Sequence, residues 1–146
     1  MNLHSQNDDI VSAIVDLQSS PVKEVDDWVL KQPQIETVLK GLHYNVMRIS
    51  QSPRNKRELL EALKQACGFP DYFGFNWSAL KDCLIDFHWR EAKGYILLFE
   101  KPLELDSSNM NMFLDIVREV GAIWKSEDIL FKVLLTNKSS SCQTSD

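Results

Sequence analysis

A short acidic stripe is the pattern in this sequence most able to bind a charged partner. Within residues 69–89 (FPDYFGFNWSALKDCLIDFHW), Ser78, Asp82 and Asp86 are spaced by four residues. This spacing predicts that the three side chains share one face of a helix. Carboxylates on a helix can form short charge-assisted hydrogen bonds with arginine or lysine groups of a partner. From composition alone, the stripe is more typical of an ordinary solvated helix face, because exposed carboxylates are common.

No combination of residues indicates catalysis or a cofactor. His4, His43 and His88 have no metal-ligand spacing with one another or with a cysteine. Cys83 has no identifiable histidine partner and lies beside an apolar helix face, so we interpret it as a buried structural thiol. The five glycines form no phosphate-binding loop. We therefore expect no catalytic residue, no metal and no cofactor, and we predict that the protein is not an enzyme.

The acidic stripe lies on a predicted helix that is indicated by a capping residue and an apolar face, and a loop precedes this helix. Asn76 is a good N-cap for a helix over residues 76–88. The apolar face of this predicted helix carries Trp77, Leu80, Leu84 and Phe87. Pro70 and Gly74 interrupt an aromatic-rich loop before the helix. Its aromatic side chains must either pack against the protein or recognise a partner.

From residue 41 onward, strands and helices alternate. Apolar runs predict strands near residues 44–50, 95–100 and 129–136. Amphipathic patterns predict helices near 53–67 and 108–124, the first beginning at Pro53 or, with Asn55 as an alternative cap, slightly later. Continuous apolar strands separated by helices favour a parallel sheet covered on both faces. The predicted fold class is therefore a small α/β sandwich.

Three segments with different character divide the chain. Residues 1–40 are predicted to be a helical N-terminal extension that is too short for a core of its own. Its helical patterns lie over residues 10–17, 28–30 and 35–39. Residues 41–137 are predicted to form the main domain. The polar segment 138–146 is predicted to be a disordered tail.

Composition excludes several classes of function. The 146 residues are 44% hydrophobic and 25% charged, which is typical of one soluble globular domain. No apolar run approaches the roughly 20 residues that cross a bilayer, and the N-terminus lacks a secretory signal pattern. A net charge of −5 argues against binding to nucleic acids or membrane surfaces. Three cysteines without a CxxC pair favour free thiols, so we expect a cytoplasmic protein.

The segment around the acidic stripe resembles the barstar family of ribonuclease inhibitors. The shared pattern, F-P-x-Y-F-G-x-N-W-x-A-L-x-D-C-L, is carried by Phe69, Pro70, Tyr72, Phe73, Gly74, Asn76, Trp77, Ala79, Leu80, Asp82, Cys83 and Leu84. A second short match, IVRE over 116–119, falls on a later predicted helix. The order of the elements also agrees from about residue 44 to residue 136. Residues 1–40 have no counterpart in the small founding member.

The resemblance implies a three-stranded parallel sheet flanked by helices, and an immunity protein that inhibits by entering a ribonuclease active site. By position, Asp82 matches the family's central acidic anchor, and Glu119 matches a supporting acid on a neighbouring helix. The partner-binding residues implied in this way are Tyr72, Gly74, Asn76, Ser78, Ala79, Lys81, Asp82, Asp86, Phe87 and Glu119. Residues 41–137 would then be a barstar-like inhibitor domain.

Three positions depart from the founding inhibitor and predict a changed partner. Ser78 replaces a second carboxylate, Lys81 replaces an aromatic contact, and Asp86 replaces a small residue. A lysine facing a basic cleft would repel it. We expect the partner to be a cognate protein toxin, a ribonuclease, bound one to one by a chain that is monomeric when alone, as in a toxin–antitoxin pair. The alternative is a toxin that is not a ribonuclease, such as an ADP-ribosylating or other nucleotide-modifying effector.

Overall fold

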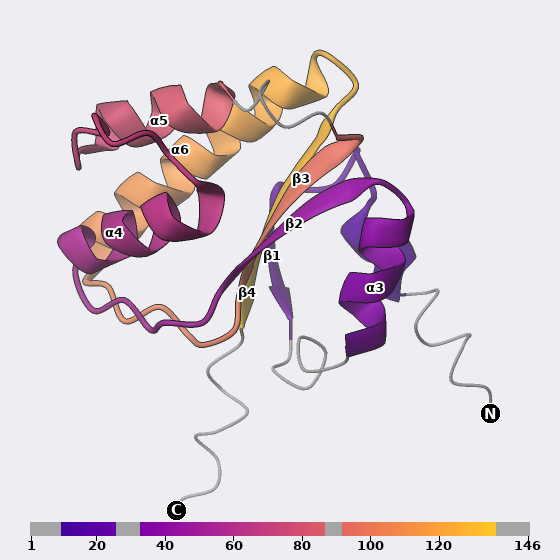
Figure 1. Cartoon of the computed structure of the whole chain (residues 1–146), viewed down its shortest axis with the longest axis horizontal. Helices are drawn as coiled ribbons and strands as arrows, with labels where there is room; N and C mark the ends of the chain where they lie inside the picture. Colours follow the sequence, from indigo (N-terminus) through magenta and orange to yellow (C-terminus); the bar gives the residue numbers. More distant parts are fainter. Residues whose placement is uncertain (1–9, 26–32, 87–91, 137–146) are drawn as a thin grey trace, which may run out of the picture.

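The computed structural model describes residues 10–25, 33–86 and 92–136 (Figure 1). Its strands and longer helices are, in chain order, β1 (Val22–Val25), α3 (Pro33–Gly41), β2 (Tyr44–Ile49), α4 (Lys56–Cys67), α5 (Trp77–Ile85), β3 (Gly94–Phe99), α6 (Ser107–Lys125) and β4 (Leu130–Thr136). Residues 10–14 form a further short helix.

Within the described residues, the strands form one sheet in the order β1-β4-β3-β2, and every pairing is parallel. The three predicted strands are present as β2, β3 and β4. The sheet nevertheless has four strands rather than the three expected, because β1 pairs with β4 from Val22↔Val133 to Val25↔Thr136. β1 is only four residues long, and its place in the sheet depends on a strand at the other end of the chain. No local pattern therefore marks it in the sequence.

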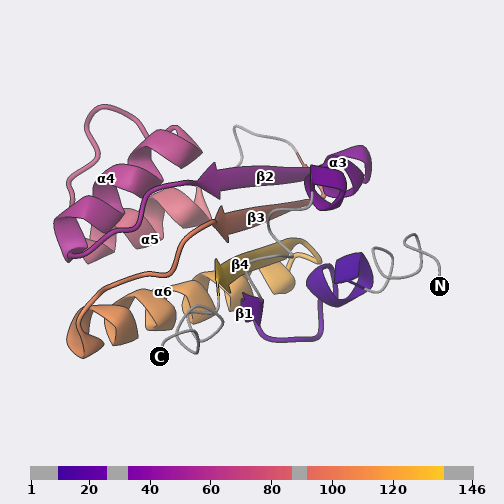
Figure 2. The ribbon, with the colours of Figure 1, turned by 90° about the horizontal axis from the view of Figure 1, so that it is seen from below.

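Helices cover both faces of the sheet (Figures 1 and 2). α4, α5 and α6 lie on one face, and α3 lies with residues 10–14 on the other. Side chains point alternately to the two faces along each strand. In β3, Leu97 and Phe99 belong to the core under α4–α6, while Ile96 and Leu98 belong to the core under α3. Coverage of both faces explains the uninterrupted apolar runs of the strands.

The N-terminal part of the chain forms a layer of the fold. Its predicted helical character is right for residues 10–14 and for α3, and wrong for β1. Ile14 and Leu39 are completely buried in the core between this layer and the sheet. The helical pattern at 28–30 and the tail predicted over 138–146 lie outside the described residues.

Capping residues set the ends of the helices that lead into the candidate site. The side chain of Asn76 accepts a hydrogen bond from the backbone N–H of Ala79 (2.8 Å), so the predicted cap of α5 is confirmed. α4 begins at Lys56, because the side chain of Asn55 caps its first turn. The start predicted at Pro53 is therefore wrong, and the alternative cap is right.

Candidate binding site

The loop at residues 68–76 is held to the core by its aromatic rings. The ring centroids of Phe69 and Phe73 are 5.1 Å apart, and those of Phe73 and Phe75 are 5.0 Å apart. Phe69 and Phe73 are buried, whereas Tyr72 between them is 87% exposed. Ring pairs at these separations are favourable beyond the area that they bury. The loop therefore presents the Tyr72 ring to solvent from a fixed base.

Asn76 fixes the point at which the loop enters α5. Its Nδ2 donates a hydrogen bond to the carbonyl oxygen of Gly74 (2.7 Å), while its Oδ1 accepts one from the N–H of Ala79 (2.8 Å). A Cβ atom at Gly74 would lie 3.2 Å from Asn76 Nδ2, so the close approach favours glycine. Asn76 and Gly74 therefore shape the loop, and both are also exposed to solvent.

α5 presents the predicted acidic stripe to solvent. Ser78, Asp82 and Asp86 are all exposed, as the spacing of four residues predicts. On the opposite side, Leu80 and Leu84 are completely buried in the core. The helix is thus anchored by one face and leaves the other face available to a partner.

Asp82 and Asp86 line a hollow between α5 and the loop. The hollow has a volume of about 390 Å³, and its other lining residues are Gly68, Pro70, Tyr72 and Cys83. Two carboxylates beside an aromatic ring suit a cationic group, and a guanidinium can both pair with carboxylates and stack on a ring. Gly68, Pro70 and Cys83 were not among the predicted binding residues, although Pro70 and Cys83 belong to the motif.

Cys83 differs from its interpretation as a buried thiol. It is half-buried, because it lies at the border between the apolar face of α5 and the hollow. Burial raises the pKa of its thiol, and the charges of Asp82 and Asp86 raise it further. The reactive thiolate is therefore disfavoured, as expected for a residue without a nucleophilic role. Cys67 is buried, and neither Cys67 nor Cys83 forms a disulfide.

Lys81 and Glu119 form an ion pair between α5 and α6. Lys81 Nζ lies 2.8 Å from Glu119 Oε1, and the side chains are 40% and 57% exposed. The same two helices are joined by a hydrogen bond from Trp124 Nε1 to the carbonyl oxygen of Leu84 (3.0 Å). The sequence could not reveal the ion pair, because it depends on how α6 packs against α5. The charge of Lys81 is thus offset by a carboxylate of its own chain.

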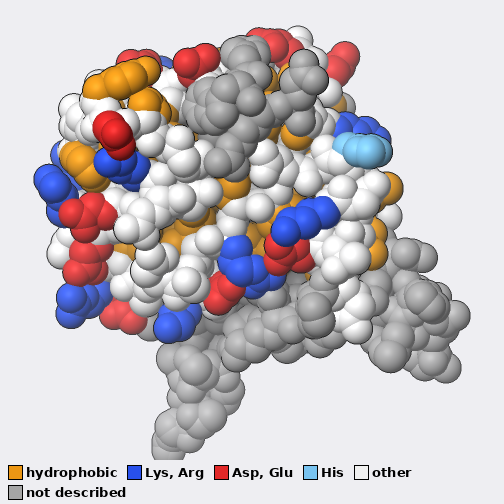
Figure 3. Space-filling model, in the orientation of Figure 1, with side chains coloured by type: hydrophobic (Ala, Val, Ile, Leu, Met, Phe, Trp, Pro, Cys, Tyr) orange, Lys and Arg blue, Asp and Glu red, His pale blue; other side chains and the backbone are white. Residues whose placement is uncertain are grey.

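The predicted binding residues lie on three neighbouring segments, although not all are equally accessible. The loop carries Tyr72 and the residues around it, α5 carries the acidic stripe and Lys81, and α6 carries Glu119. Ala79 is half-buried and packs against the core. Phe87 lies outside the described residues. In Figure 3, acidic side chains follow the upper edge over α5 and α6, while basic and acidic side chains alternate at the left edge over α4.

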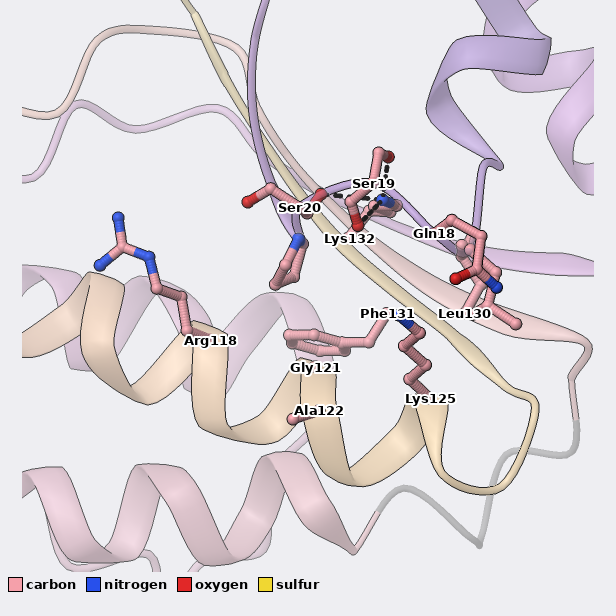
Figure 4. A pocket seen from close by; sticks show the side chains of 12 residues that line it. Gln18, Ser19, Ser20, Arg118, Gly121, Ala122, Lys125, Leu130, Phe131 and Lys132 are labelled. Carbon is pink, nitrogen blue, oxygen red and sulfur yellow. Dashed lines mark hydrogen bonds between the residues drawn. The ribbon is translucent and has the colours of Figure 1, made fainter.

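A second hollow, of about 280 Å³, lies where the chain enters β1 beside β4 and α6 (Figure 4). Lys132 of β4 is buried here, and burial lowers the pKa of its ammonium group. The ammonium donates hydrogen bonds to Ser19 O (3.0 Å), Ser19 Oγ (2.6 Å) and Ser20 O (2.8 Å). Arg118 reaches away from it (Figure 4). Because an ammonium has three donors, Lys132 is fully occupied in joining residues 19–20 to the sheet.

Two other kinds of site are absent from the described part of the chain. No cluster of three His, Cys, Asp or Glu side chains that could hold a metal ion occurs there. None of the helices in the described ranges is long and apolar enough to span a membrane.

Comparison with known proteins gives one family. The sequence profile described as Barstar (barnase inhibitor) matches residues 44–136, which is well over half of the chain. The matched region runs from β2 to the end of β4 and contains the loop, α5 and Glu119. No curated protein matches the chain. The resemblance predicted from the motif is thus confirmed, and the chain belongs to the barstar family, which is described as inhibiting barnase.

Proposed function

We propose that this protein is an immunity protein that inhibits a toxic ribonuclease by covering its active site with the loop at residues 68–76 and α5. The observation that carries the proposal is the hollow in which Asp82 and Asp86 face an exposed Tyr72. A ribonuclease cleft holds cationic side chains arranged for phosphate. Carboxylates can take the place of the phosphate through charge-assisted hydrogen bonds.

Asp82 is the proposed anchor of the complex. It lies on the exposed side of α5 and faces the loop across the hollow, while Asp86 stands one turn further along the helix. The ring of Tyr72 supplies the apolar area that usually accompanies charged anchors at interface centres. Complementary charge would also speed the encounter with a cationic cleft. Ser78, Lys81 and Glu119 would surround this centre.

This function defines the complex that we expect. The chain alone would be a monomer, and it would bind its toxin one to one without a cofactor or a catalytic step. Toxin and inhibitor would be made together as a toxin–antitoxin pair, and the inhibitor would act in the cytoplasm, where the toxin would otherwise cleave the cell's own RNA. The role of the inhibitor is then to stay bound, so slow dissociation matters more than turnover.

The proposal can be tested by measuring RNA cleavage in the presence of the purified chain. Two ribonucleases serve as probes: barnase, and the product of the reading frame next to the gene for this chain if that product cleaves RNA. Stoichiometric inhibition of either enzyme is expected, with loss of inhibition in Asp82→Asn. Full activity of both enzymes at a saturating concentration of folded inhibitor would contradict the proposal.

A toxin that is not a ribonuclease is the second candidate, and the ion pair between Lys81 and Glu119 favours it. This pair offsets one of the acids that the family resemblance places in the interface, and Ser78 supplies no charge in place of a second. A partner with a less cationic active site, such as an ADP-ribosylating or other nucleotide-modifying effector, would need fewer free carboxylates. Inhibition of NAD consumption by the adjacent gene product, without any effect on RNA cleavage, would identify this alternative.

A further inference from the structure

Cationic side chains of α4 lie over the aromatic rings on either side of Asn76. The guanidinium carbon of Arg57 is 4.2 Å from the centroid of the Phe75 ring, and Lys64 Nζ is 5.6 Å from the same centroid. Lys56 Nζ is 5.4 Å from the centroid of the Trp77 ring. All three distances fall within the roughly 6 Å over which a cation is attracted to a ring face. The cations of α4 are therefore held beside the loop that forms the candidate site.

The Phe75 ring, over which Arg57 and Lys64 lie, is itself fixed in place. Its backbone has a positive φ of 36°, a conformation that bulky residues rarely adopt. Its ring packs edge-on against Phe73, which is buried in the core. Strained backbone persists only where the surrounding structure holds it, and it occurs most often at binding and switch segments. Arg57 and Lys64 therefore stand at defined positions on the surface.

Within the described residues, two of these three cations have no carboxylate partner. Arg57 pairs with Glu61 on its own helix, with Arg57 Nε 3.0 Å from Glu61 Oε2. Lys56 and Lys64 form no ion pair with any residue in the described ranges. The surface around the loop is thus acidic on the α5 side. On the α4 side, Figure 3 shows acidic and basic side chains together, and the carboxylates of Glu58 and Glu61 are paired with Arg54 and Arg57, which leaves Lys56 and Lys64 as positive charges that no described carboxylate pairs with.

We propose that Lys56 and Lys64 of α4 form a second, positively charged part of the binding surface, and that the partner seats an acidic segment on these two lysines. This inference rests on the proposed function, because the loop is shared by both halves. A cleft that is cationic throughout would meet Asp82 favourably but would be repelled by α4. The cognate partner therefore places its cations opposite α5 and its carboxylates opposite α4. Lys56 and Lys64 then act as specificity determinants, because like charges across an interface exclude the wrong partners.

The first test uses an acidic peptide as the probe and does not depend on the identity of the toxin. The ¹⁵N-labelled chain is titrated with hexaglutamate at low salt, and amide chemical shifts are followed by NMR. The largest shifts are expected in α4 and at Phe75 and Trp77, and they should disappear in Lys56→Gln/Lys64→Gln. The matched control, Lys23→Gln/Lys125→Gln, removes two lysines from other parts of the surface and should leave the shifts unchanged. Shifts that are equally large around Lys23 and Lys125 would overturn the inference.

The second test uses barnase, whose cleft must carry cations for phosphate. Charge reversal in Lys56→Glu/Lys64→Glu is expected to tighten inhibition of barnase by about tenfold or more at low salt. The control Lys23→Glu/Lys125→Glu has the same change in net charge and should alter inhibition by less than about threefold. Weaker inhibition by the α4 variant would overturn the inference. If neither the natural chain nor the variant inhibits barnase, this test counts against the proposed inhibition of a ribonuclease. The role of α4 is then decided by the peptide titration.

Discussion

Lys81 Nζ lies 2.8 Å from Glu119 Oε1. Lys81 directly precedes Asp82 in the sequence, and it is paired with Glu119, the acid that by family resemblance supports Asp82. Without this contact, Lys81 would bring an unpaired positive charge next to the proposed anchor. With it, the charged side chains that line the hollow are the carboxylates of Asp82 and Asp86. The specificity of the site for a cationic partner therefore depends on whether the ion pair remains closed.

Substitution of Lys81 and substitution of Glu119 should change the affinity for the partner in opposite directions. Lys81→Met frees the carboxylate of Glu119 and should tighten binding to a cationic partner, whereas Glu119→Gln leaves Lys81 unpaired and should weaken it. The double variant has lost one positive and one negative charge, so the gain from the first substitution and the loss from the second should cancel. Its binding free energy should lie within about 0.5 kcal/mol of that of the natural chain. The folding free energy should change by less than about 1 kcal/mol, because the pair is exposed.

Dissociation constants for the three variants, together with urea unfolding as the control for folding, complete the double-mutant cycle. The interpretation of the pair as a charge-balancing contact fails if both single substitutions weaken binding to the same extent. It also fails if Lys81→Met weakens binding, because that result would place Lys81 against an acidic patch of the partner.

Asp82→Ala should separate binding from folding. If Asp82 is the central anchor, its removal leaves cationic groups of the partner buried without a counter-charge, at a cost of about 2–5 kcal/mol in binding. Folding should change by less than about 0.5 kcal/mol, because Asp82 is exposed. The matched control is Glu24→Ala, which removes an exposed carboxylate from β1, outside the candidate site. Equal affinity of the Asp82 variant and the natural chain would limit the family analogy to the fold.

The sequence predicted the features of the fold that are determined locally. The Asn76 cap and the exposed stripe on α5 depend on neighbouring residues, and both were predicted correctly. The amphipathic pattern that predicted a helix near residues 108–124 is also local, and on α6 Phe113, Val117, Val120 and Trp124 are buried. β1 was missed because four residues carry too little signal and their partner strand is distant in sequence.

The candidate site was predictable only as a set of residues. The motif named the positions, but the pairing of Lys81 with Glu119 and the contact of α4 with Phe75 and Trp77 are tertiary. Neither relationship follows from residue spacing, because each joins elements whose relative placement is set by the core. The charge distribution of the site therefore had to be read from the structure.

The N-terminal layer should be required for folding. Its removal would expose the face of the sheet formed by residues such as Ile96, Leu98 and Leu134, all of which are buried under α3 and residues 10–14. We expect a chain that lacks residues 1–41 to lose cooperative unfolding, as measured by circular dichroism during urea titration. Leu39→Ala, a milder change, should cost about 2–5 kcal/mol in unfolding free energy. A truncated chain that unfolds cooperatively with unchanged stability would contradict an integral layer.

Stability at low pH should depend in part on Glu36, which joins α3 to β2. Burial alone would raise the pKa of this carboxyl, but the hydrogen bonds from Lys40 and Arg48 outweigh it and hold the pKa below its ordinary 4.5. A carboxyl whose pKa is lowered by folding stabilises the fold above its unfolded-state pKa, and this contribution is lost as the pH falls through the folded-state pKa. Glu36→Gln should therefore cost on the order of 1 kcal/mol at pH 7.

The difference between Glu36→Gln and the natural chain should shrink steadily below about pH 4.5. Unfolding in urea at several pH values between 7 and 3 measures this directly, with Glu24→Gln as the control for an exposed carboxyl. A difference that stays constant over this range would mean that the ion pairs of Glu36 do not contribute to stability.

Cys83 offers a direct measure of where a partner binds. Its half-buried thiol lines the hollow between Asp82 and Asp86, whereas Cys67 is buried in the core. In a Cys142→Ser background, a thiol reagent should therefore label Cys83 first in the folded chain. Because the pKa of Cys83 is raised, labelling should be slow at neutral pH and should accelerate at higher pH than for an ordinary cysteine.

A bound partner that fills the hollow should slow the labelling of Cys83 by about tenfold or more. The control is Asp82→Ala with the partner at equal total concentrations. Its protection is measured against the free Asp82→Ala chain, because loss of the Asp82 charge itself changes the pKa of Cys83, and this protection should fall with affinity. If a partner binds tightly and Cys83 still reacts at the rate of the free chain, the hollow lies outside the interface.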